Sequence, residues 1–157
     1  HPSIPHSLIV WVPLEEARVR SRERNVPILY DFTAEWCEPC HQLEREVFKD
    51  PDAARLINAA YIPVRLVDRL DEDGENSPEV GELQRQFKIR GFPTLVYALP
   101  DQKEPRSLSG YHGYSETLEF MLLPSPRGFI PRKKQPTPSP PPPPPATPEA
   151  PPAPKAP

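Results

Sequence analysis

Proline is concentrated at one end of this chain, and its distribution limits what the chain can fold into. Of the 27 prolines among 157 residues, 16 lie between residues 124 and 157. That segment consists mainly of Pro, Ala, Ser and Thr, so it cannot bury enough apolar surface to fold. We therefore expect residues 1–123 to form one globular domain and residues 124–157 to form a disordered tail or linker. Residues 136–157 are expected to be a semi-rigid spacer in polyproline II form, with a ligand for a proline-binding module as the alternative.

Charge divides the chain at the same place. Residues 1–123 contain 14 Lys and Arg against 21 Asp and Glu, whereas the tail contains five basic residues and one acidic residue. An acidic domain binds nucleic acids poorly, so we expect no nucleic-acid partner. We also expect no membrane span within the chain, because no run approaches the roughly 18 apolar residues that a spanning helix needs.

The apolar pattern of the first 123 residues predicts strands that alternate with helices. Strands are expected at residues 26–32, 61–68, 94–99 and 106–111, and helices at residues 14–24, from Cys37, after the caps Asp50 and Ser77, and after a cap at Ser115. Residues 69–77 are expected to form a polar loop. This order predicts an α/β fold with a central mixed β-sheet flanked by helices on both faces.

The only two cysteines, Cys37 and Cys40, are followed directly by His41. The string is compatible with a redox-active dithiol or with the attachment site of a covalent haem. A haem would need a second axial ligand and an apolar pocket, and the only methionine, Met121, lies in the last expected helix. A zinc site would need two further ligands, so we expect no metal. The dithiol is favoured, and haem remains the alternative.

Longer motifs surround the cysteines. The strings "YDFTAEWCEPC", "GFPT" and "GYHGYSETLEFML" occur in this order. Together they resemble the thioredoxin family over about residues 10–123. More narrowly, they are similar to the thioredoxin-like C-terminal domain of DsbD-type thiol:disulfide interchange proteins. The resemblance implies a thioredoxin fold with a cis peptide bond before Pro93 that faces the dithiol.

The position of the dithiol suggests a division of labour between the two thiols. Cys37 is expected where a strand meets a helix N-terminus, and the unpaired N–H groups and helix dipole there lower the pKa of a thiol. We therefore assign Cys37 as the nucleophile and Cys40, one turn later and more buried, as the resolving thiol. Pro39 suits the first helical turn. No cofactor is expected beyond the redox-active disulfide itself.

Three carboxylates are candidates for tuning the dithiol. Asp31 lies within an apolar strand, where a buried carboxylate needs a partner or a task. The resemblance implies that Asp31 takes the proton of Cys40 and that Glu44 is a second acid on the active-site helix, so that both acids keep the thiol pKa values high. The alternatives are an exposed strand end for Asp31 and a solvent-facing helix residue for Glu44. Glu38, beside Cys37, is expected to raise the pKa of Cys37 and to favour a reducing dithiol. The alternative for Glu38 is an exposed side chain with little effect.

The resemblance also implies a substrate-binding surface. Trp36 is expected beside the dithiol, and Phe92, Pro93 and Thr94 are expected to form the opposite rim, where a substrate strand could bond to the backbone. Plain core packing is the alternative for Phe92. The lysine that the family carries near the end of the second strand corresponds to Arg65 or Val64, depending on the register.

These residues lead us to expect a monomeric protein-disulfide reductase. Its partners would be protein thiols and disulfides, together with an upstream thiol protein that donates electrons. A non-catalytic binding module is the alternative, and oxidase or isomerase activity differs from reductase activity only in redox potential and partner access. The chain begins with His1 rather than Met, so we expect that a signal peptide or membrane anchor was removed. The expected location is the bacterial periplasm, with the cytoplasm as the alternative.

Overall fold

Four strands form a mixed sheet in the order β2-β1-β3-β4. They are β1 (Ile28–Ala34), β2 (Ile62–Asp68), β3 (Thr94–Ala98) and β4 (Arg106–Ser109). β1 pairs in parallel with β2 and antiparallel with β3, and β3 pairs antiparallel with β4. This computed structural model describes residues 8–99, 101 and 104–122. The expected tail and its boundary at residue 123 lie outside the described residues and stay predictions.

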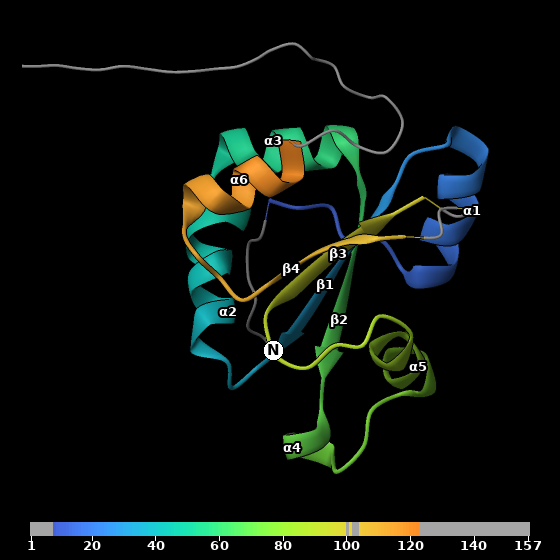
Figure 1. The fold of residues 1–157 in the computed structure, drawn as a ribbon, viewed down its shortest axis with the longest axis vertical. Coiled ribbons are helices and arrows are strands. Elements are labelled where there is room, and N and C mark those ends of the chain that lie inside the picture. Colours follow the sequence, from blue (N-terminus) through green and yellow to red (C-terminus); the bar gives the residue numbers. More distant parts are fainter. Residues whose placement is uncertain (1–7, 100, 102–103, 123–157) are drawn as a thin grey trace, which may run out of the picture. The chain divides into compact units, whose positions relative to one another are not determined.

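Helices cover both sides of this sheet, as the sequence predicts. They are α1 (Leu14–Arg24), α2 (Glu38–Leu43), the π-helical turn η1 (Glu44–Phe48), α3 (Pro51–Ala60), the one-turn α4 (Leu70–Asp73), α5 (Pro78–Gln86) and α6 (Tyr114–Leu122). Figure 1 shows α2, α3 and α6 on one side of the strands and α1 and α5 on the other. The sheet is therefore the middle layer of three.

Side-chain oxygens cap the starts of α3 and α5. The Asp50 carboxylate accepts the backbone N–H of Ala53 at 2.9 Å, and the Ser77 hydroxyl accepts that of Val80 at 3.4 Å. Both contacts satisfy N–H groups that a helix leaves unbonded at its start. The expected cap at Ser115 is wrong, because α6 already begins at Tyr114 and Ser115 lies within its first turn.

The segment expected to be a polar loop contains α4, and buried polar contacts explain the difference. Asp68 is only 5% exposed at the end of β2. Its carboxylate accepts hydrogen bonds from the N–H of Leu70 (3.0 Å), the amide of Asn76 (3.0 Å) and the amide of Gln84 (2.9 Å). These bonds fix the chain after β2, although no hydrophobic periodicity indicates a helix there.

The two faces of the sheet build two separate apolar clusters. Ile28, Tyr30 and Phe32 of β1 pack with residues of α1 and α5, whereas Leu29 packs with residues of η1, α3 and α6. Successive strand residues point to opposite faces, so Asp31 shares the face of Leu29. The carboxylate of Asp31 therefore lies under α2 and η1, on the side that carries the cysteines.

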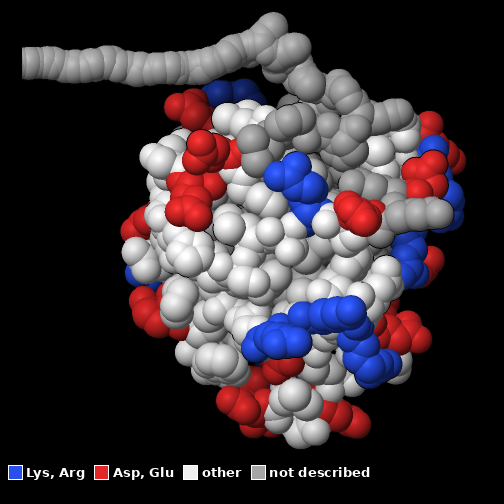
Figure 2. Space-filling view, in the orientation of Figure 1, with Lys and Arg blue, Asp and Glu red and all other residues white. Residues whose placement is uncertain are grey.

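No helix among the described residues is long and apolar enough to cross a membrane. Figure 2 shows most acidic side chains toward the margin of one face and an arc of Lys and Arg side chains across its lower part.

Candidate active site

A disulfide between Cys37 and Cys40 lies at the start of α2, with the two Cα atoms 5.3 Å apart. Cys37 caps the helix, and its sulfur accepts the backbone N–H of Cys40 at 3.2 Å. Pro39 occupies the first turn of α2, as the sequence predicts. Cys37 is 2% exposed and Cys40 is 6% exposed, so the expectation that Cys40 is the more buried cysteine is wrong for this oxidised form.

The disulfide between Cys37 and Cys40 favours the dithiol over the haem. Covalent attachment of a haem would consume both sulfurs, and these are bonded to each other here. The His41 ring is exposed on α2, and its Nε2 lies 2.6 Å from the backbone oxygen of Glu35. The ring therefore contacts the loop that leads into the disulfide.

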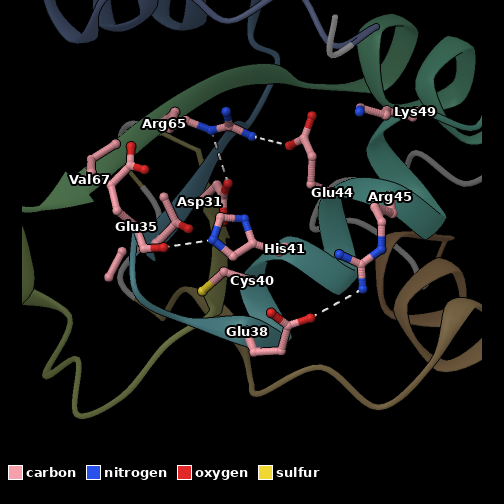
Figure 3. Close-up of a pocket in the computed structure, with 12 residues that line it drawn as sticks. Asp31, Glu35, Glu38, Cys40, His41, Glu44, Arg45, Lys49, Arg65 and Val67 are labelled. Atoms are coloured by element: carbon pink, nitrogen blue, oxygen red, sulfur yellow. Dashed lines mark hydrogen bonds and ion pairs between the residues drawn. The ribbon is translucent and has the colours of Figure 1, made fainter. Parts of the chain in front are cut away.

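A buried ion-pair cluster lies beside the disulfide. Asp31 and Arg65 are direct neighbours in the parallel register of β1 and β2. Arg65 Nε lies 3.4 Å from Asp31 Oδ2, and Arg65 Nη2 lies 2.5 Å from Glu44 Oε1. Figure 3 shows the guanidinium between the two carboxylates. Arg65, and not Val64, therefore lies opposite Asp31 and supplies the positive charge on this face. Glu44 lies in the same cluster as Asp31, as the resemblance implies.

Burial perturbs the pKa of Asp31, the acid that β1 contributes to this cluster. It is 2% exposed, and burial raises its pKa from 3.8 to about 6. The Arg65 guanidinium opposes the rise, and the nearby Glu44 charge adds to it. Asp31 Oδ1, Glu44 Oε2 and Arg65 Nε are buried without a hydrogen-bond partner among the described residues. The cluster is therefore incompletely compensated, and Asp31 can exchange a proton near neutral pH.

One pocket of about 270 Å³ connects this cluster to the dithiol (Figure 3). Asp31, Cys40, Glu44 and Arg65 all line it. The other lining residues are Thr33, Ala34, Glu35, Glu38, His41, Arg45, Lys49 and Val67. The buried acid and the second cysteine therefore line one pocket.

Glu38 lies at the outer edge of this pocket. Its side chain is exposed, and Arg45 Nη2 lies 3.3 Å from its Oε2. Solvent and this arginine both weaken the field that Glu38 exerts on Cys37. The proposed effect of Glu38 on Cys37 stays a prediction, with a small expected size.

Aromatic side chains form the rim beside the disulfide. Trp36 is 56% exposed, and its ring lies edge-to-face with that of Phe92 at a centroid distance of 6.0 Å. Phe92 is half-buried and also packs against Ala34, Cys37 and Cys40. The peptide bond between Phe92 and Pro93 is cis. Trp36 and Phe92 therefore offer a partner an apolar contact next to the sulfurs.

Thr94 does not belong to this rim, which corrects the expected substrate-binding set. It is buried, and its hydroxyl donates to the backbone oxygen of Gly91 at 2.8 Å. Its backbone pairs with Phe32 on one side and Ser109 on the other, so it lies inside the sheet. Pro93 is also buried, and its carbonyl accepts the N–H of Gly110 at 2.7 Å. A substrate-binding role for Pro93 stays a prediction.

Sequence reasoning missed Trp11. The guanidinium carbon of Arg65 lies 4.3 Å from the centroid of the Trp11 ring. More than fifty residues separate the two side chains along the chain, and no motif or periodicity links them. Only the packing of the segment before α1 brings them together.

A mixed sheet covered by helices on both faces, with a disulfide-bonded Cys-x-x-Cys at a helix start, defines a thioredoxin-fold redox domain. Residues 14–122 match the family described as thioredoxin-like domain, and the chain belongs to this family.

Named relatives support this assignment. The thioredoxin-like protein CITRX of Solanum tuberosum is 33% identical over 82 residues, which are 52% of this chain and 40% of that protein. The thiol:disulfide interchange protein DsbD 2 of Pseudomonas aeruginosa is 35% identical over 80 residues, which are 51% of this chain and 13% of that protein. The matched region thus spans less than half of either relative. The predicted similarity to the thioredoxin family and to DsbD is confirmed.

Solved structures share the fold. A thioredoxin from Thermus thermophilus has a TM-score of 0.58 at 26% identity and covers 71% of this chain and 82% of its own. The oxidised C-terminal domain of Neisseria meningitidis DsbD has a TM-score of 0.56 at 17% identity, with coverages of 71% and 97%. The predicted thioredoxin fold is confirmed.

Proposed function

We propose that this chain is a thiol–disulfide oxidoreductase that reduces protein disulfides through Cys37 and Cys40. The observation that carries the proposal is the placement of the disulfide. The sulfur of Cys37 accepts a backbone N–H at the start of α2, and Cys40 shares a pocket with the buried acid Asp31. An N–H directed at a sulfur stabilises a thiolate, which is the attacking species in disulfide exchange.

The reaction would proceed in two exchanges. The Cys37 thiolate attacks one sulfur of the substrate disulfide, the substrate S–S bond breaks, and the released substrate thiolate takes up a proton. The Cys40 thiol then gives its proton to Asp31 and attacks Cys37. The second substrate sulfur leaves as a thiolate, and the Cys37–Cys40 disulfide forms. Two electrons pass from the dithiol to the substrate.

Asp31 suits the second exchange. A carboxylate with a pKa near 6 is a stronger base than an ordinary aspartate, so it lies closer to the ordinary pKa of a thiol, about 8.5. At neutral pH it is still mostly ionised and ready to accept the proton.

The direction and place of the reaction belong to the same proposal. We assign the dithiol as the reduced reactant, regenerated by an upstream thiol protein, with no cofactor besides the cysteines. We place the protein outside the cytoplasm, in a bacterial periplasm, working as a monomer. The 35% identity to DsbD 2 supports a role in thiol:disulfide interchange.

Insulin reduction driven by dithiothreitol tests the activity. The wild-type chain should accelerate precipitation of the insulin B chain, and Cys37→Ser should abolish the acceleration. Cys40→Ser should accumulate a mixed disulfide between Cys37 and the substrate, visible by mass spectrometry. Val19→Ala, an exposed change on α1, serves as the control and should retain full activity. A wild-type chain that is reduced by dithiothreitol but does not accelerate the reaction would indicate a non-catalytic binding module.

A further inference from the structure

The segment before α1 lies against β2, which is an edge strand of the sheet. The backbone N–H of Val12 donates to the oxygen of Pro63 at 2.9 Å, and the N–H of Val10 donates to the Asn58 side chain at 3.0 Å. These bonds fix the backbone on both sides of Trp11. The segment therefore holds its ring in a defined place beside the active site.

The Trp11 ring has two partners in that place. It packs edge-to-face on Phe48 of η1 with ring centroids 5.3 Å apart, and it lies against the Arg65 guanidinium at 4.3 Å. The Arg65 side chain is only 16% exposed. One side of the guanidinium thus contacts an aromatic face, and its nitrogens approach the carboxylates of Asp31 and Glu44.

Arg65 contacts Glu44 more closely than it contacts Asp31. Its contact with Glu44 is 2.5 Å, whereas its Nε remains 3.4 Å from Asp31 and lacks a hydrogen-bond partner. An arginine side chain has several rotatable bonds. Without the Trp11 ring packed against it, the Arg65 guanidinium would therefore move toward Glu44 and solvent. An aromatic face attracts a guanidinium and resists that movement.

We propose that Trp11 is a positioning residue for the active site, whose ring keeps the Arg65 guanidinium within reach of Asp31 as well as Glu44. The consequence for thiol exchange rests on the proposed function, but the placement of Arg65 does not.

Trp11 can affect the pKa of Asp31 through the position of the Arg65 charge. Burial and Glu44 raise the pKa of Asp31, and Arg65 lowers it. The ionisable or charged groups that line the shared pocket with Asp31 are Arg65 from β2, Glu35 from the loop after β1, Glu38 and His41 from α2, Glu44 and Arg45 from η1, and Lys49 after it. Cys40 also lines the pocket but is disulfide-bonded and does not titrate. If the Arg65 guanidinium moves away from Asp31, burial and the charge of Glu44 remain, and both favour the protonated form of Asp31.

Carboxyl NMR of the oxidised chain of residues 1–157 measures this effect directly. The titration midpoint of Asp31 would be compared in wild type, Trp11→Leu and Trp11→Phe. Trp11→Leu keeps an apolar side chain but removes the ring face, so the midpoint should rise by at least about 0.5 pH units. Trp11→Phe restores an aromatic face and should return the midpoint most of the way to the wild-type value.

Two further variants separate positioning from general damage. Val12→Ala removes buried side-chain volume from the same segment on the opposite core, so it should lower stability and leave the Asp31 midpoint unchanged. In an Arg65→Met background, replacing Trp11 with Leu or Phe should produce no additional shift. An unchanged midpoint in Trp11→Leu, or an equal shift without Arg65, would overturn the proposal.

The experiment needs neither substrate nor reduction. A negative result would leave the proposed reductase function intact, and a failed insulin assay would leave this positioning role intact. If Trp11→Leu does not fold, Trp11→Met, which also lacks an aromatic face, takes its place with and without Arg65, and the same two outcomes would overturn the proposal.

Discussion

The two faces of β1 differ sharply although they belong to one strand. Ile28, Tyr30 and Phe32 point into an apolar cluster with α1 and α5. On the other face Leu29 is followed by Asp31, which meets Arg65 under the active-site helix. Because successive side chains of a strand point to opposite faces, one strand can carry a stabilising face and a reactive face at once.

The reactive face bears an energetic cost that the apolar face does not. Asp31 is fully buried, one of its oxygens lacks a hydrogen bond, and Arg65 compensates its charge only in part. Perturbed acids of this kind are common at functional sites. The apolar face of β1 carries no carboxylate; its titratable group is Tyr30, whose pKa burial raises, so that Tyr30 is neutral at neutral pH and contributes packing.

The largest effect on stability should come from the apolar face. Phe32 is fully buried and its ring lies 6.3 Å from that of Tyr30 and 6.1 Å from that of Phe87. Phe32→Ala should destabilise the fold by about 3–5 kcal/mol through lost burial and a cavity, measured by chemical denaturation. The titration midpoint of Asp31 should remain near 6 in the folded variant. A large shift would show that the two faces are not separable.

Asp31→Asn should have the next largest effect on stability, and it should raise the free energy of unfolding at neutral and alkaline pH. The folded pKa lies above the ordinary 3.8, so the protonated acid is favoured by folding. The stability that this preference contributes is present below about pH 4 and is lost as the pH rises through 6. The variant avoids that loss and should be more stable by about 3 kcal/mol above pH 7, as a pKa difference from 3.8 to about 6 implies.

Thermal unfolding across pH checks this sign. The advantage of Asp31→Asn should disappear below about pH 4, where both side chains are neutral. The same variant should resolve mixed disulfides more slowly at neutral pH, since the proton acceptor is gone. Equal stability of both proteins at pH 8 would refute the account of the reactive face.

The smallest effect should come from Glu38, which lies outside both buried faces. Glu38→Gln should lower the pH midpoint for alkylation of reduced Cys37 by less than about one unit, because the exposed carboxylate is screened and paired with Arg45. Arg45→Gln should shift the midpoint the other way. No shift in either variant would remove Glu38 from the description of the dithiol.

Much of the fold could be predicted because local signals agree with it. Asp50 and Ser77 mark helix starts by their own side chains, and the apolar run around Asp31 marks a buried strand. Cys37 and Cys40 could be proposed from their motif and Asp31 from its apolar strand, whereas Glu44 and the role of Asp31 came from the family resemblance. The choice between Arg65 and Val64 could not be made, because it depends on the register between two strands.

The remaining errors concern contacts that the sequence does not encode locally. Thr94 follows a motif proline, but sheet pairing on both sides places it in the interior. α4 is held by the side-chain bonds of Asp68 rather than by an apolar stripe. Trp11 reaches Arg65 only through the path of the chain before α1.

The reduction potential of the Cys37–Cys40 pair tests the proposed reductase function most directly. It would be measured by equilibration with dithiothreitol or glutathione buffers, followed by alkylation and mass spectrometry. The account predicts a value near that of thioredoxin, roughly −270 mV, which allows the dithiol to reduce protein disulfides. A value near roughly −120 mV would contradict it, because such a pair would oxidise its partners instead.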